Sequence, residues 1–207
     1  MDPKDAILRA AQVVFARHGF RQTAMAMVAE EARLTRQALY HHFDSKEALF
    51  AALVDLLHGE ALGAAKDAAA KGGRDAADAV MQIVLAYHRN LVAGVSGSPY
   101  ATELVEESSR HCGAAIGAFA KRYEKVLETA IAGLARAGRL TLRGITAHEL
   151  AQMIAVAAKG VKVAYAGESE AAHAQALKRM VEVICAGAGA LPVKAQPRTG
   201  TMRRATR

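Results

Sequence analysis

Apolar residues recur at helical spacing along nearly the whole chain, and this periodicity restricts the fold more than any other feature of the sequence. In one stretch Leu150, Ile154 and Val161 return to the same side after one or two helical turns. No stretch sustains the strict alternation of apolar and polar residues that is typical of a half-buried strand. We therefore expect an all-α protein.

Start and stop signals divide this pattern into about nine helices. Asp2-Pro3 begins the first helix, because aspartate caps well and proline suits the first helical position, and Gly19 ends it. The other expected helices are Ala24–Ala32 capped by Thr23, Arg36–His42 capped by Thr35, about Ser45–Lys71 with Asp44 and Glu47 spaced as a capping box, about Asp75–Ala93, one that restarts at Ser98-Pro99, about Ala114–Ala137, Ala147–Ala166 with Thr146 and Glu149 as a second capping box, and about Glu170–Ala186.

These helices are expected to form two domains. Residues 1–46 hold three helices, and residues 47–190 form a larger bundle. Residues 191–207 have no periodicity and indicate a disordered basic tail.

The net charge of +7 is located mostly in that tail. The first 57 residues carry seven basic and seven acidic side chains, whereas residues 191–207 carry five basic ones and no acid. Basicity alone therefore does not identify the folded part as a nucleic-acid binder, and any such argument depends on local pattern.

The local pattern of residues 24–43 is that of a helix-turn-helix unit, two short helices joined by a tight turn. Apolar residues of the second short helix face the core of the three N-terminal helices. The polar residues of the same helix therefore remain outside. The helix start at Thr35 offers free N–H groups to phosphate, Arg36 can pair with guanine and Gln37 with adenine, and the Tyr40 hydroxyl suits a phosphate oxygen. Lys46 opposes the dipole of its own helix at a cost of roughly 0.3–1 kcal/mol. Either a DNA phosphate compensates or the side chain points into water.

The stretch GFRQTAMAMVAEEARLTRQALYHHFDSKEALFAAL resembles the DNA-binding region of the tetracycline-repressor (TetR) family of bacterial transcriptional regulators. The resemblance extends over about Ile7 to Leu53 and beyond it covers only length and helical architecture. It implies a homodimer that binds a palindromic double-stranded operator and leaves it when a small-molecule inducer binds in the bundle. The residues that it places on DNA are Thr23 and Lys46 at phosphates, and Thr35, Arg36, Gln37, Ala38, Tyr40 and His41 along the groove, with Tyr40 on the DNA backbone.

Two residues depart from the family pattern. Arg33 stands where the turn commonly has glycine, and a left-handed backbone there would cost a non-glycine residue on the order of 1–2 kcal/mol. Gln37 stands where a small residue is common, so it adds a long polar side chain to the reading surface.

We expect no metal, no cofactor and no catalysis. His41 and His42 point about 100° apart on a helix and do not share an ion, so His18 gains no metal partner from them. His111-Cys112 lacks further ligands at metal spacing, and no nucleophile elbow or P-loop is present. The apolar runs are interrupted by charges and the N-terminus has no signal-peptide core, so we expect a cytoplasmic protein without a membrane span.

The resemblance makes the aromatic and imidazole residues of the bundle candidates for an inducer site. The alternative is that they only pack in the core and on the surface. These candidates are Tyr87, His88, Tyr100, Phe119 and Tyr123. The last two long helices are rich in small residues and have broad apolar faces, which favours a four-helix dimer interface over packing within one chain. Two other functions remain open: a DNA-binding regulator or architectural protein without an inducer, and a helical enzyme or carrier with an incidental motif.

Overall fold

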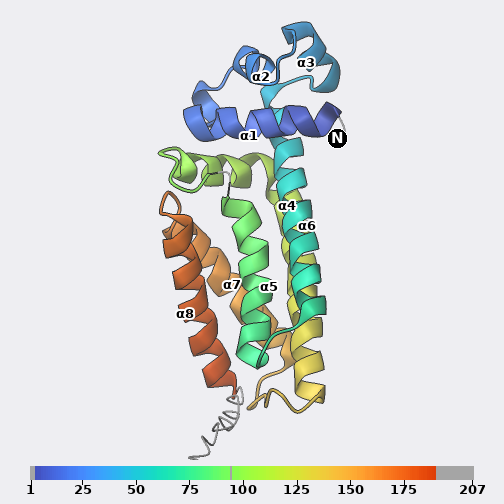
Figure 1. Ribbon diagram of the computed structural model, residues 1–207, viewed down its shortest axis with the longest axis vertical. Coiled ribbons are helices and arrows are strands. Elements are labelled where there is room, and N and C mark those ends of the chain that lie inside the picture. The colour runs from blue at the N-terminus through green and yellow to red at the C-terminus, as the bar shows by residue number, and fades with distance from the viewer. Residues whose placement is uncertain (1–2, 94, 190–207) are drawn as a thin grey trace, which may run out of the picture.

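The computed structural model describes residues 3–93 and 95–189, and over that part of the chain it contains eight α-helices and no strand (Figure 1). This confirms the all-α prediction. The helices are α1 (Pro3–Gln22), α2 (Met25–Glu31), α3 (Arg36–His42), α4 (Lys46–Lys71), α5 (Ala76–Val92), α6 (Ala101–Arg136), α7 (Ala147–Ala164) and α8 (Glu170–Ala188). The predicted cap Asp2 and the predicted tail 191–207 lie outside the described residues.

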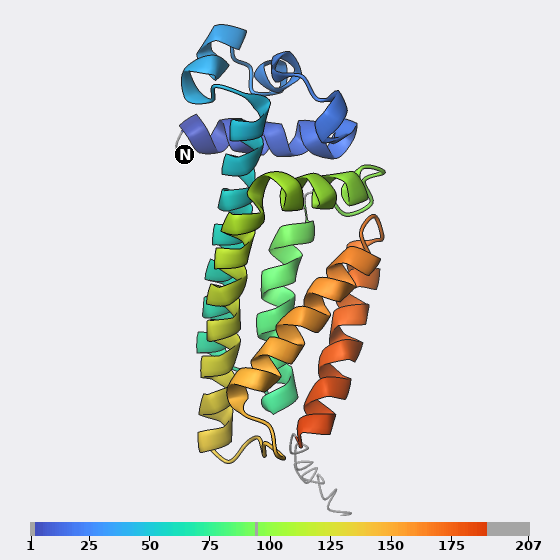
Figure 2. The same cartoon turned by 180° about the vertical axis from the view of Figure 1, so that it is seen from behind.

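The count differs from the expected nine because α6 is continuous where two helices were predicted. Gly113 and Gly117 lie inside it, and a Cβ at either position would meet nothing within 4 Å. Figure 2 shows that α6 nevertheless changes direction: its first part runs beneath α1, and the remainder follows α4 along the molecule.

Side-chain caps start several helices at the predicted places. Thr35 accepts a hydrogen bond from the amide of Ala38, and Thr146 forms the predicted reciprocal pair with Glu149. Two predicted caps are wrong. Ala24 precedes α2 without a side-chain cap, because the Thr23 hydroxyl donates back to the Gly19 carbonyl instead. At α4 the cap is Ser45 rather than its neighbour Asp44, and it accepts from the amide of Ala48.

Two hydrophobic cores lie one above the other along the molecule. Helices α1–α3 form a head at one end, and α5, α7 and α8 lie beside the long α4 and α6 (Figures 1 and 2). Leu49 and Leu53 of α4 belong to the core of the head, whereas Ala61 and Ala65 belong to that of the bundle. Helix α6 is divided in the same way, so both helices connect the two cores. The boundary predicted at residue 46 falls at the start of α4.

Helix α4 is also the one described helix that is long and apolar enough to cross a membrane by length and composition. Its buried residues face the two cores of this fold, and they include Leu49, Leu53, Ala61 and Ala65. Burial within the protein therefore accounts for its apolar character, as in the core helix of a globular protein.

Candidate functional site

The exposed side of α3 carries most of the residues predicted to read DNA. Leu39 is completely buried and anchors the helix in the head's core. Polar residues on the other sides remain outside, as the helix-turn-helix prediction requires. Thr35, Arg36, Gln37, Tyr40 and His41 are exposed, and Ala38 is half-buried.

Arg36 and Tyr40 form a pair on this surface. The guanidinium carbon of Arg36 lies 5.6 Å from the centre of the Tyr40 ring, one helical turn away. A cation–π contact of this kind contributes about 0.5–1 kcal/mol at an exposed site and restricts both side chains. The contact therefore holds the planar guanidinium near the N-terminus of α3, where base recognition is expected.

The turn before α3 contains the residue that departs from the family's usual glycine. Arg33 has φ 56°, and it is the one non-glycine residue with positive φ among those described. The turn therefore has the left-handed geometry despite the missing glycine. The backbone strain is on the order of 1–2 kcal/mol.

Lys46 lies in the first turn of α4, where a cation opposes the helix dipole, and the structure compensates this with neither a DNA phosphate nor exposure to water alone. Its ammonium donates to the carbonyl oxygens of Phe20, at 2.8 Å, and Arg21, at 3.3 Å. It also lies 4.5 Å from the centre of the Phe20 ring. Because the C-terminus of a helix carries partial negative charge, Lys46 gains at the end of α1 what it loses at the start of α4.

Thr23 is buried beside the same helix end. Its hydroxyl donates its proton to the Gly19 carbonyl at 2.6 Å. Gly19 itself has φ 73°, and a Cβ there would lie 2.8 Å from the Tyr100 ring and from a Glu103 carboxylate oxygen. The end of α1 can approach α6 this closely only because residue 19 is a glycine.

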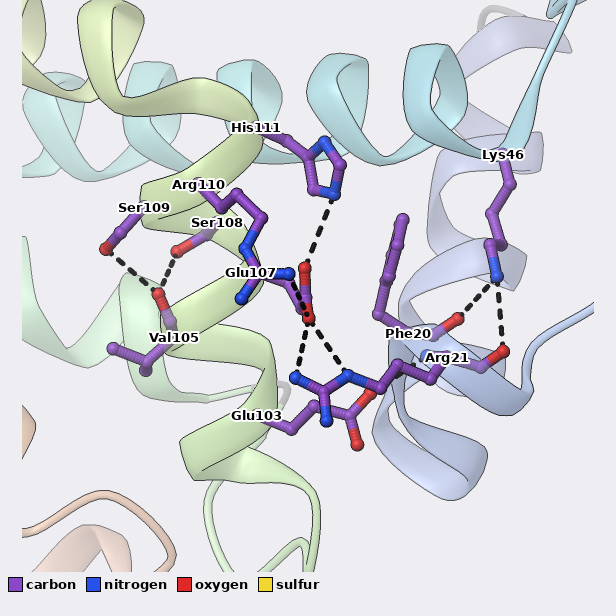
Figure 3. A network of polar contacts seen from close by, with 10 residues as sticks. All are labelled: Phe20, Arg21, Lys46, Glu103, Val105, Glu107, Ser108, Ser109, Arg110 and His111. Atoms are coloured by element: carbon purple, nitrogen blue, oxygen red, sulfur yellow. Dashed lines mark hydrogen bonds and ion pairs between the residues drawn. The ribbon is translucent and has the colours of Figure 1, made fainter.

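A polar network joins this end of α1 to the first part of α6 (Figure 3). The Arg21 guanidinium donates twice to a Glu107 oxygen, at 3.0 and 3.1 Å, and its amide donates to Glu103 at 2.8 Å. Arg110 and His111 approach Glu107 as well, at 3.6 and 3.3 Å. Burial raises the pKa of the Glu107 carboxyl, but the hydrogen bonds from Arg21 and the charges of Arg110 and Arg21 outweigh it and lower the pKa overall. Glu107 is therefore an ionised, buried anchor between the two helices.

The opposite side of that α6 segment borders a partly open cavity of about 80 Å³, which we call the inter-domain pocket. It lies between the head and the bundle and has an apolar wall on the side of the head. Six of its lining residues show how many elements contribute: Phe15 of α1, Phe50 and His58 of α4, Leu104 of α6, Lys162 of α7 and His173 of α8.

Four of the five residues predicted for the inducer site gather in the bundle, next to this pocket rather than on its wall. The rings of Tyr87 and Tyr123 are stacked with centres 3.9 Å apart, and His88 lies against both. Phe119 joins through His58, against whose ring it stacks at 5.5 Å.

Tyr100, the fifth of these residues, is elsewhere. It packs against the core of the head near Gly19 and away from the other four. Its position follows from the course of α6, whose start lies beneath α1 (Figure 2).

Sequence reasoning missed the three basic residues that line the pocket, His58, Lys162 and His173. Each continues a buried apolar row at four-residue spacing. The rows are Phe50, Val54, His58 and Leu62; Leu150, Ile154, Ala158 and Lys162; and His173, Leu177, Val181 and Cys185. A basic side chain in the register of a core stripe was the available signal.

Burial lowers the pKa values of these groups and of the neighbouring His88. It lowers the pKa of His58 to about 4 and that of His88 to about 3, with the positive charge of Lys162 as the next cause. It also lowers the pKa of Lys162 to about 8. At neutral pH the histidines are therefore neutral and Lys162 supplies the pocket's positive charge. No group of three His, Cys, Asp or Glu side chains in the described part of the chain is arranged to hold a metal ion.

The outer surfaces of α7 and α8 expose large apolar side chains. On α7, Met153, Val156 and Val163 are 52%, 64% and 56% exposed, and with Gly160 they follow a spacing of three, four and three residues. On α8, Val183 is 63% exposed. This spacing is that of the apolar seam of packed helices.

Residues 7–53 match the family model described as "Bacterial regulatory proteins, tetR family". Over 52 residues the chain is 44% identical to the HTH-type transcriptional regulator TtgR of Pseudomonas putida. That match covers 25% of this chain and 25% of TtgR, so the chain matches about a quarter of the length of this curated relative.

Solved structures resemble nearly the whole chain. A TetR-family transcriptional regulator from Pectobacterium atrosepticum has a TM-score of 0.69 at 24% identity, over 92% of this chain and 95% of that one. The regulator FadR from Bacillus subtilis, solved in complex with stearoyl-CoA, has a TM-score of 0.66 at 18% identity, over 88% and 97% of the two chains. At these identities the likeness shows a common fold.

Proposed function

Because the chain belongs, through its N-terminal segment, to the tetR family of bacterial regulatory proteins, we propose that it is a cytoplasmic, DNA-binding transcriptional regulator. In this proposal it is a homodimeric repressor that leaves a palindromic operator when a small molecule binds in the bundle. The observation that carries the proposal is the exposed start of α3, where Thr35, Arg36 and Gln37 stand clear of the core while Leu39 fixes the helix beneath them.

Each residue of this surface has a role in the proposed complex. Arg36 pairs with guanine and Gln37 with adenine in the major groove, while Tyr40 donates to a phosphate. Ala38 and His41 line the groove, and Thr35 presents its backbone amide at the helix start.

The phosphate contacts proposed for Lys46 and Thr23 are more constrained. An ammonium has three donors, and two of those of Lys46 already serve carbonyl oxygens, so one is available for a phosphate. Thr23 has its single hydroxyl proton committed to Gly19, so its contact with phosphate requires that bond to open or uses the backbone amide.

The exposed apolar seam of α7 and α8 supports the dimer. Burying Val156 and Val163 against the same face of a second copy would create a two-fold interface, and two recognition helices would then meet two half-sites. Sedimentation velocity is expected to give a dimer for the wild type and a monomer for Val156→Glu, because the charge would lie unpaired in the interface. A wild-type monomer at micromolar concentration would contradict this part of the proposal.

The first part of α6 supports ligand control. On one side it borders the inter-domain pocket through Val105, and on the other it holds the end of α1 through Glu103 and Glu107. A ligand that binds better to one position of this segment shifts the head with it, because differential affinity is what moves such an equilibrium. A FadR of the same fold was solved in complex with stearoyl-CoA, and this supports the proposal that a small molecule also binds the present chain.

A titration of fluorescent DNA from the region flanking the protein's own gene tests the proposed function. We expect sequence-preferring binding that weakens steeply with salt, and Arg36→Ala is expected to weaken it by about 1–3 kcal/mol. Glu30→Gln is a control that alters a charge on an exposed residue of α2, outside the predicted reading surface. Equal affinity for DNA of any sequence, or a DNA affinity that Arg36→Ala leaves unchanged, would contradict the proposal.

A further inference from the structure

Lys162 is the one cationic side chain among the described residues that line the inter-domain pocket, and it has no anionic partner there. Glu168 is the one carboxylate among the same residues, but it is exposed and forms no ion pair within 4.0 Å of the Lys162 ammonium. Most of the surrounding wall is hydrocarbon, including Phe15, Phe50 and Leu53. Lys162 is half-buried, and a charge in such surroundings is costly unless an opposite charge pairs with it.

A second, independent observation is a set of hydrogen-bonding atoms without partners beside the same pocket. His173 lines the pocket and is 3% exposed, yet its Nε2 atom has no partner. Behind it His88 is equally buried and both of its ring nitrogens lack partners, as does the Tyr123 hydroxyl. Buried polar atoms normally have partners, so the unpartnered His173 Nε2 on the cavity wall points to a missing polar group there.

The charge of the missing polar group follows from the charges of the residues around the pocket. The three neighbouring histidines, His58, His88 and His173, all feel the positive charge of Lys162, which contributes to lowering the pKa of each after burial itself. A cationic ligand would meet the same repulsion. A doubly charged anion would retain one unpaired negative charge, because Lys162 is the single cation among the described lining residues. A single negative charge matches the ammonium.

We propose that the inter-domain pocket binds a small organic acid, with its carboxylate on the Lys162 ammonium and the His173 Nε2–H, and its apolar body against Phe15, Phe50 and Leu53. This proposal rests on the proposed function and deepens it, because it identifies the chemical class of the ligand. The carboxylate would bond the bundle at α7 and α8, while the apolar body would touch α1, α4 and the first part of α6.

Isothermal titration calorimetry of the full-length protein with benzoate and octanoate at pH 7 tests this assignment. The neutral analogues benzyl alcohol and octan-1-ol and the cation benzylammonium have similar bodies and serve as comparisons. Both acids are expected to bind at least tenfold more tightly than their alcohols, because a hydrogen bond to a charged group contributes enough for a factor of ten. Benzylammonium is expected not to bind. Equal affinity for an acid and its alcohol, or no binding of either acid, would overturn the proposal.

Lys162→Met keeps a chain of similar length without the charge, and Lys159→Met makes the same change at an exposed position of the same helix. We expect the first variant to bind the acids at least tenfold more weakly and the second to bind as the wild type. Acid binding unchanged in a folded Lys162→Met would overturn the assignment. If that variant fails to fold, the comparison of acids and alcohols on the wild type still decides. DNA titration without any acid is unaffected by these outcomes, so failure of the ligand assignment is separable from failure of the proposed function.

Discussion

The head and the bundle differ in how completely their buried polar groups are hydrogen-bonded. At the junction with the head, Thr23 and Glu107 are both nearly inaccessible, and each has hydrogen-bond partners. All the described buried side-chain nitrogens and oxygens that lack partners lie in the bundle, on His88, Tyr123 and His173. A fully bonded head specifies one rigid arrangement, whereas unpartnered groups in the bundle lower stability and suit a site that a ligand completes.

The largest predicted effect is a loss of stability in the head. Leu39→Ala is expected to lower the free energy of unfolding by about 2–5 kcal/mol, because Leu39 is fully buried and its loss leaves a cavity under α3. Chemical denaturation followed by circular dichroism measures the change. Gln37→Ala, on the exposed side of the same helix, is the matched control and is expected to stay within about 0.5 kcal/mol of the wild type. Equal effects of the two variants would contradict the core described for the head.

A smaller effect of opposite sign is predicted for the bundle. His88→Phe is expected to raise the free energy of unfolding by about 1–3 kcal/mol at neutral pH, because it replaces a buried ring with two unpartnered nitrogens by an apolar ring of similar shape. The same denaturation experiment measures it. A clear loss of stability would show that His88 has partners in solution, and the contrast between head and bundle would fail.

The pH dependence of stability sharpens the same point. The pKa of His88 is lowered to about 3, mainly by burial, so below pH 6.5 the unfolded chain takes up a proton that the folded chain refuses. Stability therefore falls as pH drops from 6.5 toward 3, with a slope from this group that approaches about 1.4 kcal/mol per pH unit. His88→Phe is expected to have a shallower acid slope than the wild type, and His58, with a pKa of about 4, to retain its own share.

The smallest effect concerns the one strained residue of the head. Arg33→Gly is expected to raise the free energy of unfolding by about 0.5–1 kcal/mol, because glycine adopts φ 56° without strain but loses more backbone freedom on folding. Arg33→Ala removes the same charge and keeps the strain, so it is expected not to stabilise. A stabilisation that both variants share would assign the effect to charge.

Local signals account for what was predictable from the sequence. The bounds of α3 and the reciprocal cap of Thr146 and Glu149 were predicted correctly, because each depends on residues within one turn of one another. The surface of exposed residues on α3 followed from the same local pattern.

The remaining features depend on partners far away in the chain. Lys46 bonds carbonyl groups 25 and 26 residues earlier, so no local rule reveals its role. Tyr100 packs near Gly19 because α6 begins beneath α1, which also separates it from the other predicted inducer-site residues. The sequence does place Lys162 in register with the buried Leu150 and Ile154. Its role in the pocket nevertheless depends on histidines from other helices.

The most direct test of the account measures DNA affinity and acid binding on the same sample. The affinity for the DNA flanking the protein's own gene is measured without benzoate and at concentrations that calorimetry shows to be saturating. The account predicts at least a fivefold loss of DNA affinity in benzoate, and an equal loss of benzoate affinity on DNA, since coupling between two sites is reciprocal. Lys162→Met is expected to show no such loss at the same benzoate concentration. DNA affinity that stays unchanged in the wild type while benzoate saturates the pocket would contradict the account.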